Sequence, residues 1–199
     1  MKTTFKALMI AIAIFATSMT ASLAQDFQKG LDAAQSGDFA TALREWKPLA
    51  EQGYAAAQFN LGLIYANGQG VTQDYAEAVK WYRKAAEQGD AAAQYNLGLM
   101  YRQGRGITQD YAEAVNWYRK AAEQGDALAQ NNLGYMYYNG KGVIQNFVIA
   151  HMWWNIAASN GHENAVNNRD KIAKLMTASQ LEKAQELARE CVQKNYKGC

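Results

Sequence analysis

Three residue types are scarce in this sequence of 199 residues, which contains one proline, two cysteines and two histidines. Glycine occurs 16 times, and polar residues are mixed with alanine and aromatic residues along the whole chain, which excludes a low-complexity tail. Hydrophobic residues make up 49% of the chain and charged residues 19%, as is typical of a folded protein. A chain of this length can bury a packed core.

The motifs of common catalytic sites are also missing. The chain contains no G-x-S-x-G, H-E-x-x-H, Walker or S-x-x-K sequence. Beyond residue 24 the reactive side chains form no recognised constellation; they are His151, His162, Ser36, Ser159, Ser179, Cys191 and Cys199. We therefore interpret the chain as a non-enzymatic protein with no cofactor and no metal site. His151 is interpreted as a core or groove-lining residue, and His162 as a solvated turn residue.

The first 24 residues have the pattern of a secretory signal peptide. Two lysines precede an apolar run at 7–16, and small residues occupy positions 22 and 24. The run is short for a membrane-spanning helix, and an uncleaved anchor is the alternative. We predict cleavage between Ala24 and Gln25 and a periplasmic or secreted mature protein.

The mature chain that this cleavage would produce has no net charge. The whole sequence has 20 basic and 18 acidic residues, and the first 24 residues contain two of the lysines and no acid. A nucleic-acid-binding protein needs a surplus of basic residues to displace phosphate counterions, and a membrane-surface protein needs a basic face. The charge balance therefore excludes both classes.

The two cysteines lie close together at the C-terminal end. In an exported protein, the C-x7-C pair of Cys191 and Cys199 predicts a disulfide that holds the C-terminus in place. A loop this short contributes about 2–3 kcal/mol by the chain-entropy estimate. The alternatives are a free redox pair, for which C-x-x-C is the expected spacing, and metal ligation, for which further ligands are missing.

An internal repeat of 36 residues is the strongest signal in the sequence. Segments 55–90 and 91–126 match at 29 of 36 positions, and 127–162 matches the preceding copy at 16 of 36. Each copy contains two helical patterns around a glycine-rich connection, as at 55–67 and 74–88, so the period indicates stacked helical hairpins. The recurring columns include Leu61, Leu97, Leu133; Gly62, Gly98, Gly134; Ala78, Ala114, Ala150; and Trp81, Trp117, Trp153.

The pattern A-x-A-x-x-N-L-G-x-x-Y-x-x-G-x-G-V, followed by D-Y-x-E-A-x-x-W-Y-R-K-A-A-E-Q-G, resembles the Sel1-like repeat, a relative of the tetratricopeptide repeat. The resemblance implies an all-α, right-handed α/α solenoid with repeats at 55–90, 91–126 and 127–162. A degenerate repeat is expected at 25–54, with its second helix interrupted at Pro48. The period ends at 162, and we expect capping helices within 163–199, at 164–175 and 179–194, with Thr177 as an N-cap.

By resemblance to tetratricopeptide repeats, the first helix of each unit lines a concave groove that binds a partner. Within it, Asn60, Asn96 and Asn132 either contact the backbone of a bound peptide or hold a neighbouring helix or loop carbonyl. The third copy adds two tyrosines as anchors, and Arg102 is a candidate for contacting a carboxylate. The expected partner-binding residues are Phe59, Asn60, Leu63, Ala66, Tyr95, Asn96, Leu99, Arg102, Asn131, Asn132, Tyr135 and Tyr138.

These features predict an exported protein that mediates protein–protein interaction through its concave face, as an adaptor or regulator in the cell envelope. The partner is a protein of unknown identity, such as an envelope enzyme or sensor; nucleic acid and stable membrane insertion are not expected. The alternatives are binding of a glycan or peptidoglycan fragment and a purely structural spacer. A penicillin-interacting enzyme is a further reading, but the relatives linked to that activity carry cysteine pairs inside the repeats, which are missing here.

Overall fold

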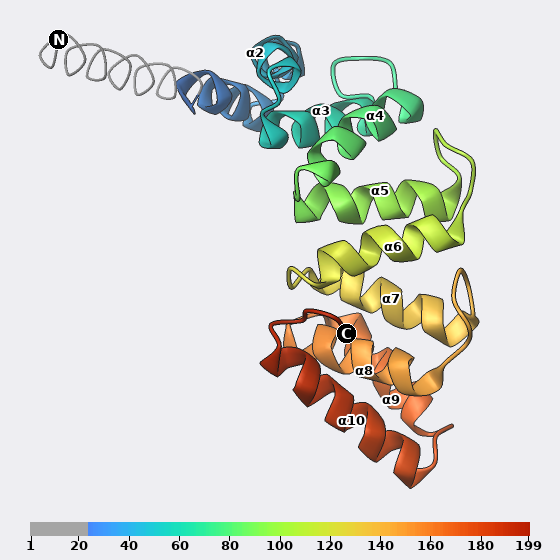
Figure 1. Ribbon diagram of the computed structural model, residues 1–199. Helices are drawn as coiled ribbons and strands as arrows, with labels where there is room; N and C mark the ends of the chain where they lie inside the picture. The colour runs from blue at the N-terminus through green and yellow to red at the C-terminus, as the bar shows by residue number, and fades with distance from the viewer. Residues whose placement is uncertain (1–23) are drawn as a thin grey trace, which may run out of the picture.

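The computed structural model describes residues 24–199, and these residues form a stack of helices (Figure 1). All but the last residue of the expected signal peptide lies outside the described residues. Residues 24–35 are helical. The helices that follow are α2 (Phe39–Glu51), α3 (Ala55–Asn67), α4 (Tyr75–Glu87), α5 (Ala91–Gln103), α6 (Tyr111–Ala122), α7 (Ala127–Asn139), α8 (Phe147–Ser159), α9 (Glu163–Ala173) and α10 (Ala178–Gln193).

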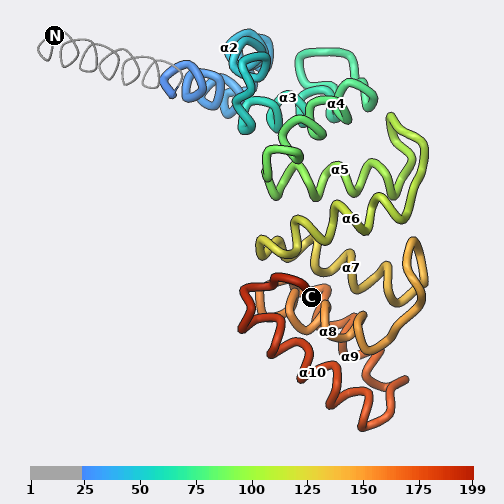
Figure 2. The backbone as a smooth tube through the Cα atoms, viewed as in Figure 1, coloured from blue at the N-terminus to red at the C-terminus, as the bar shows by residue number. Residues whose placement is uncertain are grey.

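The helices pair and stack in chain order. α3 packs on α4, α5 on α6 and α7 on α8, and each hairpin also contacts the next through α4 with α5 and α6 with α7. The tube in Figure 2 follows this path, with wide loops joining the two helices of each hairpin on one side of the stack. At the C-terminal end, α9 and α10 both pack against α8. The prediction of an all-helical solenoid is confirmed.

The helices of the repeats begin and end at capping residues. The Asp110 side chain accepts hydrogen bonds from the backbone N–H groups of Ala112 and Glu113, which satisfies free donors at the start of α6. Gly104 ends α5 with a φ of 67°, a left-handed conformation that glycine adopts without strain. Both residue types recur in the other repeats, and this recurrence fixes the hairpin length.

Glycines inside the first helix of each hairpin allow an aromatic ring to pack against the helix backbone. A Cβ atom added at Gly98 would lie 2.8 Å from the Tyr118 ring, and one at Gly134 would lie 2.5 Å from Nε1 of Trp154. Gly30 stands in the same relation to Trp46 of α2, so the pair formed by residues 24–35 and α2 packs in the same way. The glycine columns therefore mark the closest helix contacts of the core.

Buried glutamines join consecutive repeats. Gln94 of α5 donates to the Ala86 carbonyl of α4 at 3.0 Å and accepts from Nε2 of Gln124 at 2.8 Å. Gln58 and Gln130 occupy the same position in the other copies and make equivalent bonds. These glutamines were not among the residues predicted from the sequence to have a structural role.

The second helix of the N-terminal pair differs from expectation. Pro48 was expected to interrupt it, but α2 continues through Pro48 to Glu51. The proline lies in the last turn of the helix, where the hydrogen bond that it cannot donate would go to the Arg44 carbonyl. Both residues are exposed, so water can satisfy that carbonyl.

The C-terminal helices extend the stack further than the sequence period suggested. The period was expected to end at residue 162, but α9 keeps the same 36-residue register at Ala165, Asn168 and Ile172. Ala165 and Ile172 are buried, as are their counterparts in α7. The residues between these positions differ from those of the three repeats, so the register is hard to recognise in the sequence. At the start of α10, Thr177 forms the expected N-cap and exchanges two hydrogen bonds with Gln180.

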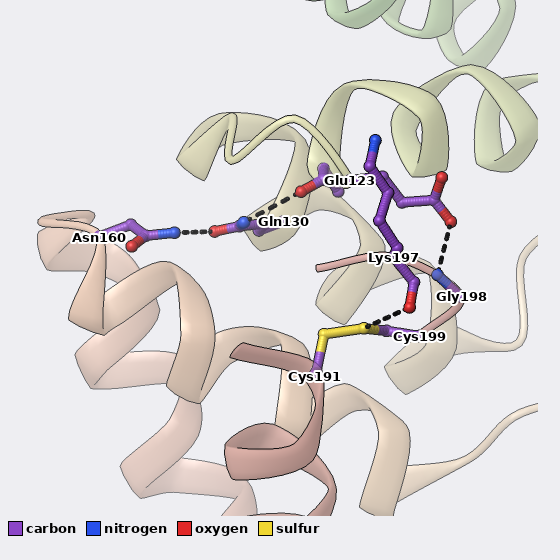
Figure 3. The surroundings of a disulfide bond; sticks show 8 residues. Glu123, Gln130, Asn160, Cys191, Lys197, Gly198 and Cys199 are labelled. Carbon is purple, nitrogen blue, oxygen red and sulfur yellow. Dashed lines mark hydrogen bonds between the residues drawn. A yellow bond between two sulfur atoms is a disulfide. The ribbon is translucent and has the colours of Figure 1, made fainter. Parts of the chain in front are cut away.

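The chain ends in a short segment folded back onto the last repeats. Cys191 of α10 is bonded to Cys199, which supports the predicted pairing. The backbone N–H of Gly198 donates to a carboxylate oxygen of Glu123 at 3.3 Å, at the end of α6 (Figure 3). The same figure shows Asn160 donating to Gln130, at 2.9 Å. The Tyr196 hydroxyl of the same segment donates to the Asn160 side chain at 3.1 Å, so Asn160 links the chain's C-terminal segment to the last member of the glutamine column.

Candidate binding face of the helical stack

Eleven of the twelve residues expected to bind a partner, all but Ala66, retain contact with solvent. They lie on α3, α5 and α7, and we call this set the A-helix face. Ten are partly exposed, and the Tyr135 side chain is 37% exposed. Ala66 does not belong to it, although it was expected to line the groove. It is only 9% exposed and packs in the core, because its small side chain faces the helices behind α3.

Two aromatic residues of the A-helix face also serve the core. The Phe59 ring packs 6.0 Å from the Tyr82 ring, and the Tyr95 ring packs 5.9 Å from the Tyr118 ring, both centroid to centroid. These tilted pairs bury one edge of each ring against the neighbouring hairpin helix. Both residues are also partly exposed, so Phe59 and Tyr95 belong to the face as well as to the edge of the core.

Arg102 lies near the tyrosine pair of the second repeat, Tyr95 and Tyr118. Burial raises the pKa of the Tyr118 hydroxyl, and the nearby positive charge of Arg102 acts in the opposite direction. The pKa of Tyr95 is also raised, chiefly by burial, and a hydrogen bond from Asn132 and the Arg102 charge both oppose this rise. Among the described residues, Arg102 Nε has no hydrogen-bond partner although it is buried.

The asparagine column serves more than one purpose. Nδ2 of Asn96 donates to the Ala92 carbonyl of its own helix at 2.8 Å, and Asn132 lies near the Tyr95 hydroxyl of the preceding repeat, where it acts to lower the pKa of that hydroxyl. Neighbouring Asn131 accepts from Nε1 of Trp154 at 3.1 Å through its carbonyl, and from Asn168 of α9 at 3.3 Å through its side chain. Asn131 thus links α7 to α8 and α9, whereas the Asn96 bond lies within α5.

An apolar pocket of about 220 Å³ lies where the A-helix face reaches the C-terminal cap. Tyr138 forms one wall, and its ring stacks 5.5 Å from Phe147 and lies 5.7 Å from Trp154. The exposed Tyr135 lies at the same pocket. The full lining is Tyr135, Tyr138, Asn139, Trp154, Asn168, Lys171, Ile172 and Leu175.

Six of the eight lining residues were not predicted from the sequence, and four of these six come from the C-terminal cap. Asn168, Lys171, Ile172 and Leu175 lie in α9 and the turn after it, which were assigned only a capping role. The sequence pattern that could have predicted these residues is the weak 36-residue register of α9, which places Asn168 in the column of Asn132. Leu175 is 62% exposed and adds an apolar side chain at the pocket.

The charges on the A-helix face are few and of one sign. Helices α3, α5 and α7 contain no aspartate or glutamate, and Arg102 is their one basic residue. At the pocket, Lys171 adds a second cation, and it forms no ion pair within residues 24–199. Its neighbour Asp170 pairs with Arg169 at 2.8 Å.

A second, more polar pocket of about 460 Å³ lies between α8, α9 and α10. His151 lines it and is 3% exposed, and Nδ1 of its ring has no hydrogen-bond partner in the described part of the chain. Burial lowers the pKa of His151, and the Arg169 charge lowers it further against the opposing effect of Asp170. Burial and the Arg169 charge thus both disfavour the charged form of His151.

No group of three or more histidine, cysteine, aspartate or glutamate side chains between residues 24 and 199 is placed to hold a metal ion. Within the same residues, no helix has the length and apolar character needed to cross a bilayer.

Comparisons with known proteins agree with this architecture. The solved structure of a Sel1 repeat protein from Oxalobacter formigenes has a TM-score of 0.68 and 38% identity, and the match covers 72% of this chain and 57% of that one. The structure of a protective antigen present in uropathogenic Escherichia coli strains, displaying an SLR fold, has a TM-score of 0.61 and 30% identity, with coverage of 87% and 47%.

The chain spans less than two thirds of the length of either structure. No curated protein sequence matches it. The family model of the Sel1 repeat matches residues 55–90, 91–126 and 127–162, which together make up more than half of the chain. The chain therefore belongs to the Sel1 repeat family.

Proposed function

We propose that this chain is an exported, non-enzymatic scaffold that binds another protein through its A-helix face, as an adaptor or regulator in the cell envelope. The continuity of that face carries the proposal. Eleven side chains keep solvent contact along α3, α5 and α7, and the row ends at an apolar pocket with exposed Tyr135 and Leu175. Exposed apolar groups gathered at a concavity mark interaction sites on soluble proteins.

The character of the face suits a polypeptide ligand. Partly exposed aromatic rings and amides alternate with aliphatic side chains, as in Tyr95, Asn96 and Leu99 of α5. Tyrosine contributes large contact areas at binding surfaces with little loss of conformational entropy. Sel1 repeats commonly mediate protein–protein interactions, which supports the same conclusion.

A site-specific crosslinking experiment tests the proposal. A photoreactive amino acid placed at Tyr135 is expected to capture a specific envelope protein in the producing cells. The matched control is the same amino acid at Ile144, which is 91% exposed on the loop between α7 and α8. Capture at both positions, or at neither, would contradict a binding role for the A-helix face.

A variant experiment addresses the same point without a crosslinker. The double variant Tyr135→Ala, Leu175→Ala removes two exposed apolar side chains and is expected to lose the partner in an affinity purification. The single variant Ile144→Ala removes an exposed apolar side chain elsewhere and is expected to retain it. Retention of the partner by the double variant would contradict the proposal.

Export is the second part of the proposal. The lysines, apolar run and small residues of the first 24 positions support it, and the Cys191–Cys199 disulfide is compatible with an oxidising compartment. Intact-mass measurement of the protein from a periplasmic or culture-supernatant fraction is expected to show a chain that begins at Gln25. Recovery of the full-length chain from the cytoplasm would contradict export.

Glycan binding remains the rival, because aromatic and amide groups lie together in the pocket at Tyr138, Trp154, Asn139 and Asn168. A stacking ring beside amide groups is a chemistry that also suits a sugar. Titration with muropeptides, followed by tryptophan fluorescence, separates the two functions. The scaffold proposal predicts no saturable change, whereas a saturable change lost in Tyr138→Ala would favour glycan binding.

A further inference from the structure

The pocket between α7 and α9 is small and selective. Its volume of about 220 Å³ is below the ~300–1,000 Å³ that is usual for sites of small-molecule ligands. Its lining combines two aromatic rings, Tyr138 and Trp154, with the aliphatic side chain of Ile172. A cavity of this size and lining suits one bulky apolar side chain.

The edge of the pocket is apolar and exposed. Tyr135 and Leu175 contribute accessible side chains from α7 and from the turn after α9. Single exposed apolar residues are common on soluble proteins, but these two lie at the same aromatic concavity. An inserted side chain would therefore be contacted on its flanks as well as at its tip, as is typical of an anchor residue in an interface.

The electrostatics favour a carboxylate next to that anchor. Lys171 lines the pocket and has no ion-pair partner among residues 24–199. The acid beside it, Asp170, is paired with Arg169 and lines the other pocket. Since α7 contributes no acidic residue, an approaching carboxylate meets a cation and no like charge from that helix.

We propose that this pocket receives a bulky apolar side chain from a partner protein and that Lys171 pairs with an aspartate or glutamate next to it. This inference rests on the proposed function and specifies its ligand. It assigns separate roles to α7, α8 and α9: Tyr135 and Tyr138 enclose the anchor, Trp154 closes the base, and Lys171 selects the flanking charge.

A peptide selection tests the proposal directly. Random peptides displayed on phage are selected on the purified protein, and the enriched sequences are expected to combine an aromatic residue or leucine with an acidic residue one or two positions away. An enriched peptide is then labelled with fluorescein, and its Kd is measured by fluorescence polarisation. Enrichment of sequences without the acid, or no enrichment, would overturn the proposal.

Three variants locate the contacts. Leu175→Ala and Lys171→Glu are each expected to weaken binding at least about fivefold, whereas Lys47→Glu, a charge reversal on exposed α2 far along the chain, is expected to have no effect. Leu175 is exposed, so its replacement spares the core. Equal binding by the wild type and Lys171→Glu would overturn the proposal.

A charge swap separates a direct pair from a general loss of binding. Replacing the peptide acid by lysine is expected to weaken binding to the wild type and to restore part of it with Lys171→Glu. Absence of that restoration would overturn the assignment of Lys171.

The crosslinking at Tyr135 keeps this inference distinct from the proposed function. If a protein is captured at Tyr135 but its binding is unchanged in Leu175→Ala and Lys171→Glu, the pocket assignment fails and the scaffold function stands. If no protein is captured at Tyr135, the scaffold function itself fails.

Discussion

Gln94 accepts a hydrogen bond from Gln124 within its own repeat and donates one to the carbonyl of Ala86 in the preceding repeat. The glutamine is buried, so both bonds form away from bulk water. Because the same arrangement recurs at Gln58 and Gln130, a polar column runs beside the apolar core and connects each hairpin to the next. The column fixes the stacking register, since a displaced repeat would leave buried amides without partners.

The first prediction concerns this column. Gln94→Leu removes two hydrogen bonds of about 0.5–1.5 kcal/mol each, so we expect a loss of about 1–3 kcal/mol in the free energy of unfolding. Urea unfolding followed by circular dichroism measures the change. Gln103→Leu is the matched control, because Gln103 is exposed on the same helix, and its effect is expected to be small. Equal effects from the two variants would show that the column contributes nothing specific.

The second prediction concerns the close contact between α5 and α6. In Gly98→Ala the new methyl group would lie 2.8 Å from the Tyr118 ring and 3.2 Å from the Ala114 carbonyl oxygen. Such overpacking costs about 1–3 kcal/mol, more than the ~0.5–1 kcal/mol gained from better helix propensity. We expect a net loss of stability in thermal or urea unfolding.

A double-mutant cycle identifies the cause of that loss. In a Tyr118→Leu background, the smaller side chain leaves room for the methyl group, so Gly98→Ala is expected to cost less than in the wild type. Additive effects of the two substitutions would place the cost elsewhere, for example at the Ala114 carbonyl.

Most of the fold could be predicted because the repeat makes packing positions visible as columns. Gly98, Ala114 and Trp117 recur at fixed spacing, and period and residue size together indicate helical hairpins in close contact. Pro48 was misjudged because the effect of a proline depends on how near the helix end lies and on the exposure of the carbonyl it leaves free. Those two quantities come from the structure.

The site could be predicted only in part. Tyr135 and Tyr138 stood out because they break their columns, and both line the pocket. Lys171 and Leu175 could not be paired with them, since contact across α7 and α9 depends on how the cap docks. The role of Asn131 was hidden for the same reason: its partners, Trp154 and Asn168, lie on two later helices.

The third prediction concerns the C-terminal disulfide. Reduction, or replacement of both cysteines by alanine, is expected to lower the free energy of unfolding by about 2–3 kcal/mol, because the closed loop restricts the unfolded chain. The measurement is thermal unfolding with and without reductant. The double variant Cys191→Ala, Cys199→Ala is the control and should not respond to reductant. A wild type that is equally unresponsive would contradict a stabilising role for the bond.

The fourth prediction concerns pH. His151 is buried beside Arg169, and its pKa is lowered from the ordinary histidine value near 6.5. Below that pH the unfolded chain binds a proton that the folded chain resists, so stability is lost as pH falls from about 6.5 toward the folded pKa. One such proton accounts for at most about 1.4 kcal/mol per pH unit. Above pH 7 the histidine is neutral in both states and contributes no slope.

Comparison of the wild type with His151→Gln isolates this effect. The variant lacks the titratable ring at residue 151 but keeps every other titratable group. Urea unfolding between pH 7.5 and about pH 5 should show a stability difference that is constant at the upper end and shifts in favour of the variant as pH falls. Asp170 and Arg189 also line this pocket, and their charges act on His151 as well. The pKa of His151 should therefore be measured directly, by following its ring signals by NMR over the same pH range. A measured pKa at or above 6.5 would mean that Asp170 outweighs burial and Arg169, and the stability difference would then move in the opposite direction.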